Sequence, residues 1–192
     1  MLTARPDVLD FLLTRRSRPA KTLTAPVPDH AALMPILTAA LRTPDHGKLE
    51  PWRLIVLEKP ALDRLADLAV KRGQAIGQDA DRLEKTRRQF ADADLVVVVV
   101  ASPVASPKVP EGEQILSAGA VCLAVLNAAL ASGWGANWLT GAMATDAAFL
   151  TEGLQIAAPD FIAGFIHIGS ETSAPPDRPR PDIAVKVTWI SA

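Results

Sequence analysis

The sequence predicts a layered sandwich of helices and strands, of the α/β or α+β class. Helical segments with one apolar face interleave with short runs of β-branched residues. Five consecutive valines, Val96–Val100, fit a central strand that is covered on both faces. The chain has 192 residues, of which 49% are hydrophobic, so one domain with a sizeable core is expected over residues 1–192.

In the amino-terminal half, the apolar spacing predicts two helices before the first strand. The first covers residues 7–14, and Asp7 is expected to cap it. The second covers residues 29–41 and contains Pro35, so it either kinks there or begins later than Asp29 suggests. A strand over 52–58 and two amphipathic, charged helices over 61–72 and 79–91 follow.

After the valine run, a long helix is expected over residues 111–132. It is rich in small side chains and apolar nearly all round, so it should be buried on several sides. Small residues also let a second helix approach closely, and a symmetric dimer contact would use such a surface. A helix over 147–156, capped by Asp146, and a strand over 161–168 follow.

The carboxyl-terminal tail has four prolines in "PPDRPRP" and then the segment "AVKVTWI". Val185, Val187 and Trp189 alternate with other residues, which predicts an extended arm that ends in a short strand. Such an arm commonly packs on a partner subunit.

Composition excludes several classes of function. The formal net charge is −1, which gives no electrostatic case for nucleic acid or an anionic membrane. The lone Cys122 excludes an intrachain disulfide, and three separated histidines show no metal-ligand spacing. Asp7 and Asp10 interrupt the apolar amino terminus, which is unlike a signal peptide. The apolar stretch Ile115–Leu130 is shorter than the ~20 residues that span a bilayer, so a soluble, cytoplasmic protein is expected.

Three separated clusters are candidates for a binding site, and each has a plain structural alternative. Arg15, Arg16 and Ser17 would suit a phosphate or polyol, or would simply place charge at a helix end. The proline-stiffened loop that holds Arg42 and His46 could face one ligand, or could be an ordinary turn before the strand.

The third cluster is "ASGWGANWLTG", residues 131–141. Its glycines admit a flat ligand near the backbone, or they form a turn between a helix and the core. The sequence has no G-x-S-x-G elbow, no phosphate-binding G-x-x-x-x-G-K-[ST] loop, no H-E-x-x-H and no G-x-G-x-x-G. Since no acid–base pair or nucleophile is evident, no catalytic side chain is assigned and a cofactor is expected to supply the chemistry.

Four motifs in this order resemble the FMN-dependent nitroreductase family, especially its compact single-domain members. They are R-R-S, then "R-x-P-D-H-…-P-W", then "K-V-P-…-E-…-S-A-G", then "G-x-x-W-x-[ST]-G". The resemblance implies a three-layer α/β/α sandwich with a central mixed, mainly antiparallel sheet. It also implies a homodimer that binds FMN at the subunit interface, with the carboxyl-terminal arm exchanged between partners.

The same resemblance assigns the cofactor-binding residues. Arg15, Arg16 and Ser17 would hold the FMN phosphate and ribityl chain. Arg42 and His46 would reach the flavin of the other subunit. Trp138, Leu139 and Thr140 would lie along the flavin. The nicotinamide of NADH or NADPH would bind the stretch Ala128, Ala129, Leu130, Ala131, Ser132 and Gly133.

The function that the resemblance implies is an NAD(P)H-dependent oxidoreductase that reduces nitroaromatics, quinones or similar small acceptors by ping-pong hydride transfer through FMN. Three alternatives stay open: a reductase or dehalogenase for another small acceptor, a flavin-binding dimer without turnover, and an interaction domain without cofactor. Gly47, Gly112 and Leu139 stand where relatives often carry polar, basic or aromatic residues, which bears on the acceptor more than on flavin binding.

Overall fold

The computed structural model describes residues 2–191 and contains a five-stranded sheet. The strands are β1 (Leu23–Thr24), β2 (Trp52–Glu58), β3 (Leu95–Ala101), β4 (Gly135–Leu139) and β5 (Phe161–Glu171). Their order is β1-β5-β3-β2, and β4 also pairs with β5, alongside β1. All four pairings are antiparallel. The long strand β5 therefore joins β3 on one side to the two short strands on the other.

The valine strand β3 lies between β2 and β5, and all seven of its residues are buried. Side chains alternate across a strand, so the valines divide between two cores. Val96, Val98 and Val100 belong to one apolar cluster, and Val97 and Val99 belong to the other. The prediction of a central strand covered on both faces is confirmed.

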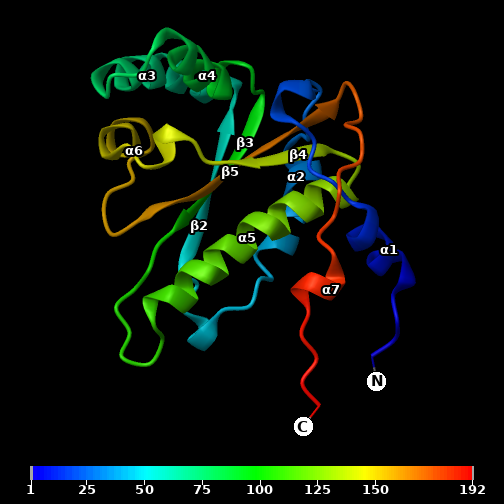
Figure 1. Ribbon diagram of the computed structural model, residues 1–192. Helices are drawn as coiled ribbons and strands as arrows, with labels where there is room; N and C mark the ends of the chain where they lie inside the picture. The colour runs from blue at the N-terminus through cyan, green and yellow to red at the C-terminus, as the bar shows by residue number, and fades with distance from the viewer. Residues whose placement is uncertain (1, 192) are drawn as a thin grey trace.

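The helices are α1 (Pro6–Thr14), α2 (His30–Ala40), α3 (Lys59–Ala75), α4 (Ala80–Ala91), α5 (Glu111–Ala131), α6 (Ala147–Leu154) and α7 (Ile183–Lys186). Figure 1 shows α3, α4 and α6 on one face of the sheet and α5 across the other. The two apolar clusters give the same division, with α3, α4 and α6 in one and α2 and α5 in the other. This confirms the three-layer sandwich with a mainly antiparallel sheet.

The cap predicted for Asp146 is confirmed, and the alternative of a later start for the second helix is wrong, because Asp29 caps α2 and the helix runs through Pro35. The Asp29 and Asp146 carboxylates accept backbone N–H bonds from Ala32 at 2.8 Å and Phe149 at 2.7 Å, which fixes the starts of α2 and α6. The cap predicted for Asp7 is wrong. Helix α1 begins at Pro6, because proline suits the first helical turn, and Asp7 instead pairs with Arg5 at 2.9 Å.

Helix α5 is the longest helix in the described chain, with 21 residues, and by length and composition it could span a bilayer. The expectation that the apolar stretch is too short to span a bilayer is therefore wrong on length, because the helix begins at Glu111, four residues before Ile115. Its apolarity has a core explanation: eight of its residues, among them Val121, Cys122 and Val125, are buried. Leu116 and Leu123 remain exposed at 75% and 44%.

The short strand expected near Val185 is wrong. Residues Ile183–Lys186 form one helical turn, capped by Asp182, and the chain beyond it has no regular structure up to residue 191. A strand needs a neighbouring strand to satisfy its backbone, and nothing in the described chain pairs with this segment. Five apolar side chains of the tail are exposed: Ile183, Val185, Val187, Trp189 and Ile190.

Candidate functional site

The cluster Arg15, Arg16 and Ser17 follows directly after α1, and all three residues are half-buried. Arg15 Nη2 donates to Ser17 Oγ at 3.2 Å. Arg15 Nε and Arg16 Nη1 are buried and have no hydrogen-bond partner within residues 2–191. Buried N–H groups of a cation without an acceptor are costly, so each of these two guanidiniums favours an acceptor such as an anion.

The tail adds positive charge at this cluster. Burial lowers the pKa of Arg15, and the nearby charges of Arg180 and Arg18 lower the same pKa further. Arg180 is separated from Arg15 by most of the sequence, and only the fold brings the two together. Arg18 pairs with Glu171 at 3.4 Å and Arg180 with Asp177 at 3.5 Å, so Arg15 and Arg16 are the guanidiniums that favour an anionic ligand with several oxygens, as a phosphate has.

The residues after Ser17 run along β4. Arg18 N donates to Ala136 O at 2.8 Å, and Asn137 Nδ2 donates to Arg18 O at 2.7 Å. These two bonds fix the backbone of Arg18 against the middle of β4. Ala20 and Lys21 then reach a cavity that Leu139 also lines. A continuous strip of protein therefore leads from the arginine cluster to the cavity.

Trp138 and Leu139 lie on β4, and Thr140 follows it, so the turn considered as the alternative for residues 131–141 is partly wrong. Trp138 Nε1 donates to Ala163 O of β5 at 3.2 Å. The indole also packs against Gly164, where a Cβ atom would stand 2.6 Å from Trp138 Cδ1. Gln89 Nε2 of α4 donates to Thr140 O at 2.9 Å, so α4 holds the end of this segment.

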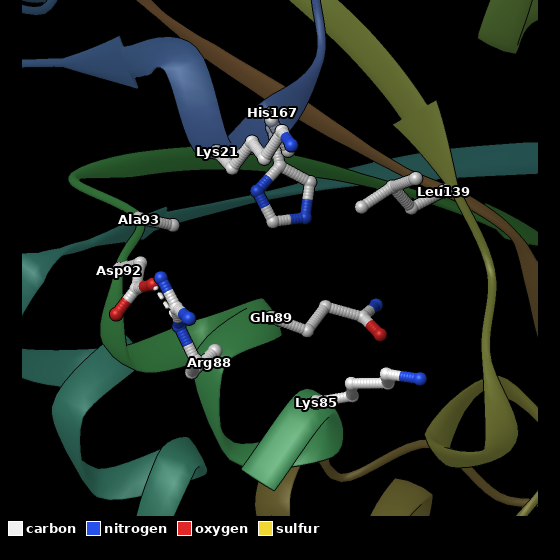
Figure 2. A pocket seen from close by; sticks show the side chains of 9 residues that line it. Lys21, Lys85, Arg88, Gln89, Asp92, Ala93, Leu139 and His167 are labelled. Carbon is white, nitrogen blue, oxygen red and sulfur yellow. Dashed lines mark hydrogen bonds and ion pairs between the residues drawn. The ribbon is translucent and has the colours of Figure 1, made fainter. Parts of the chain in front are cut away.

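The cavity beside Leu139 has a volume of about 280 Å³ and opens between α4, β5 and the segment before β1 (Figure 2). Its lining residues are Ala20, Lys21, Lys85, Arg88, Gln89, Asp92, Ala93, Leu139 and His167. Arg88 Nε pairs with Asp92 Oδ2 at 2.7 Å, which leaves Lys21 and Lys85 as the other charges. The side chains that line the cavity therefore carry a net positive charge.

Of the cavity residues, the sequence had predicted only Leu139. The charged positions of α4 read as a solvent face, and no local signal placed Lys21 or His167 near Leu139. His167 is 4% exposed, and burial lowers its pKa to about 4. Figure 2 shows its imidazole ring pointing into the cavity.

Arg42 and His46 lie away from the arginine cluster within one chain. His46 Nδ1 lies 2.9 Å from Glu113 Oε2 in the first turn of α5. One turn later, Ser117 Oγ donates to Pro44 O at 2.9 Å and accepts from Trp52 Nε1 at 3.0 Å. The loop is thus fixed to the start of α5, whereas the arginine cluster packs on β4, after the end of that roughly 30 Å helix.

Gly47 in the same loop has a φ of +76°, a conformation that favours glycine. The absence of a polar side chain at this position is therefore consistent with the local backbone. Both Arg42 and His46 are exposed, so their side chains are accessible to a second molecule.

The stretch from Ala128 to Gly133 forms the last turn of α5 and the turn that follows. Ala128 and Ala131 line a second cavity of about 440 Å³, together with Val8 and Leu12 of α1 and Ala39 of α2. This cavity is mainly apolar, and it is separate from the one beside Leu139. The assignment of these residues to nicotinamide stays a prediction. No group of three or more metal-ligating side chains occurs within residues 2–191.

Comparison with known proteins places this geometry in a family. The model described as "Nitroreductase family" matches residues 12–170. The chain is 35% identical over 164 residues to "Putative NAD(P)H nitroreductase YdjA" of Escherichia coli strain K12, which covers 85% of this chain and 88% of that protein.

Two solved structures share the fold. A nitroreductase-like family protein from Bacillus cereus superposes with a TM-score of 0.79 at 22% identity over 100% of both chains. A Desulfovibrio desulfuricans protein, described as "a putative nitroreductase in complex with fmn", superposes with a TM-score of 0.74 at 22% identity over 98% of this chain and 99% of that chain. On the family match and the sequence identity together, the chain belongs to the nitroreductase family.

Proposed function

We propose that this protein is an NAD(P)H-dependent FMN oxidoreductase that reduces small acceptors such as nitroaromatics and quinones. The observation that carries the proposal is the pair of buried guanidinium atoms, Arg15 Nε and Arg16 Nη1, that have no acceptor within residues 2–191. They stand at one end of the strip that leads to the cavity beside Leu139. A phosphate at one end and a flat ring at the other fit this layout.

The hydrogen-bond donors of this region suit both the phosphate and the ring of FMN. Arg15 and Arg16 offer charged N–H groups to a phosphate, with Ser17 beside them. Toward the cavity, the backbone of β4 and the side chain of Leu139 offer a narrow surface along which a ring would lie. Lys21 and Lys85 add positive charge, which favours an electron-rich ring edge.

FMN, when bound, would supply hydride transfer between the nicotinamide and the acceptor. The protein's own residues would hold the flavin in position, limit the access of water and present the ring to one small molecule at a time. In this proposal no side chain acts as an obligate acid or base, and protons come from water.

A homodimer is part of the proposal. Arg42 and His46 are exposed and lie far along α5 from the arginine cluster, so they fit the site of a second copy. Exposed apolar side chains on α1, α5 and the tail support the same arrangement: Leu9, Leu12, Leu13, Leu116, Leu123, Val185 and Trp189. Exchange of the tail between subunits, a single domain over 1–192 and a cytoplasmic location belong to this proposal.

Absorbance spectroscopy tests the function. The purified protein is incubated with excess FMN, freed of unbound flavin, and then given NADPH or NADH without oxygen. A retained flavin band near ~450 nm that bleaches with reductant, and returns with a nitroaromatic or quinone, is expected. A band that persists with both nucleotides would indicate a flavin-binding dimer without turnover. A colourless protein would contradict the proposal.

A further inference from the structure

His167 is a polar residue in an apolar layer. On β5 it has Val96 and Asn137 as cross-strand neighbours. Side chains alternate along a strand, so His167 shares the face of Phe165, which belongs to the apolar cluster under α3, α4 and α6. A valine or leucine would pack at such a position without cost, whereas a buried polar group needs a hydrogen bond.

The imidazole lacks a complete set of partners. His167 Nε2 is buried and has no hydrogen-bond partner within residues 2–191. A histidine that served only the core would be expected to bond a neighbouring carbonyl or side chain. Instead the ring points into the cavity beside Leu139 (Figure 2).

The surroundings keep this imidazole uncharged. Desolvation lowers its pKa to about 4. The charged side chains that line the same cavity are Lys21 before β1 and Lys85, Arg88 and Asp92 of α4 and its end, and cations outnumber the single carboxylate. A neutral imidazole carries one N–H donor and one acceptor nitrogen, so it matches a polar ring edge better than an anion.

We propose that His167 is a ligand-contact residue whose Nε2 hydrogen-bonds the polar edge of the flavin ring at the inner end of the cavity. The inference rests on the proposed function, because the cavity adjoins the Trp138–Thr140 segment along which the ring would lie. Such an edge carries carbonyl and N–H groups, and either kind satisfies one nitrogen of a neutral imidazole.

The test separates the ring from the phosphate. Dissociation constants for FMN and for lumiflavin, which has the ring without ribityl or phosphate, are measured for wild type, His167→Leu and His167→Gln. His167→Leu should weaken both ligands by the same factor, about 3- to 10-fold, as the loss of one neutral hydrogen bond does. His167→Gln, which keeps a donor and an acceptor, should retain most of the affinity. His30→Gln, at an exposed histidine of α2, is the matched control and should change neither constant.

Imidazole nitrogen NMR of the wild-type protein keeps the test valid if a variant does not fold. The chain has three histidines, and His30→Gln and His46→Gln assign two of them. Addition of lumiflavin should move the Nε2 resonance of His167. The inference on His167 is overturned if wild type binds FMN and lumiflavin, the His167 variants bind both with unchanged affinity, and lumiflavin leaves the His167 resonance unmoved. The proposed function would stand in that case. If wild type binds no FMN, the proposed function itself fails.

Discussion

His46 Nδ1 and Glu113 Oε2 lie 2.9 Å apart although the two residues are 67 positions apart in sequence. Ser117, one helical turn after Glu113, holds Pro44 and Trp52 of the same loop. Residues four apart lie on one face of a helix, so a single face of α5 orients the loop. The rigidity that the prolines indicate is thereby completed by tertiary contacts, while the His46 side chain remains more than half accessible.

Replacing Arg15 with alanine should release FMN without unfolding the protein. A charge-assisted hydrogen bond contributes roughly 1.5–3 kcal/mol, which corresponds to about 10- to 150-fold in affinity. Titration of FMN and of riboflavin, which lacks the phosphate, measures the effect, and only FMN should weaken. Arg5→Ala is the control, because Arg5 is exposed and pairs with Asp7. Equal FMN affinity in both variants would remove Arg15 from the site.

Glu113 should act on flavin binding through His46. The pair is half-exposed, with side chains 58% and 51% accessible, so its own contribution to stability should be small. We expect Glu113→Ala and His46→Ala each to weaken FMN a few-fold, and the double variant to be no weaker than His46→Ala alone. Independent, additive losses would show that Glu113 does not orient His46.

Acidification should destabilise the fold through His167. Its pKa is about 4 in the folded chain and about 6.5 in an unfolded chain, so the unfolded state binds the proton first as pH falls. The stabilisation is complete above about pH 6.5 and is lost progressively toward pH 4, by about 3 kcal/mol in total.

Urea denaturation from pH 7.5 to pH 4.5 measures that loss, and His167→Leu should flatten the profile. Asp146 contributes to the pH dependence of stability at lower pH. Its hydrogen bonds from Arg72 hold its pKa below the ordinary value, so its stabilisation disappears only at still lower pH. A slope between pH 4.5 and 6.5 that persists in His167→Leu would point to another group.

Gly164→Ala should disturb the Trp138 side chain. The added methyl would stand 2.6 Å from Trp138 Cδ1 and 3.1 Å from the buried Cys122 Sγ. We expect a loss of about 1–3 kcal/mol in the free energy of unfolding, together with weaker FMN binding. Gly112→Ala is the control, since no atom lies within 4 Å of its Cβ position, and a helix gains stability from alanine.

If the proposed homodimer uses the exposed face of α5, Leu116→Asp should convert it to a monomer. Leu116 is 75% exposed on α5, and a charge there opposes burial against a second copy. Sedimentation measures the change, and FMN affinity should fall with it because Arg42 and His46 would no longer reach a partner's site. Ile76→Asp, at the end of α3 and 48% exposed, is the control and should remain dimeric. A Leu116→Asp dimer of unchanged stability would place the interface elsewhere.

Local patterns were sufficient for most of the elements. Helical spacing predicted the long helices to within a few residues, and the valine run predicted β3 and its burial. The two shortest strands were missed, because β1 has two residues and β4 begins in a glycine-rich segment. Each is a strand only by virtue of its pairing with β5.

The sequence by itself singled out the arginine cluster, the proline-stiffened loop of Arg42 and His46, and the segment Trp138–Thr140 as candidates for a cofactor site, and their assignment to FMN stays a prediction. Their residue types carry charge and planarity whatever the fold. Only the tertiary structure decided that Arg180 approaches Arg15, that Gln89 holds Thr140, and that His167 faces a cavity. These relationships join residues that are distant along the chain, and local patterns carry no information on such contacts. They form because burial of two apolar layers on one sheet fixes where every strand and helix end must lie.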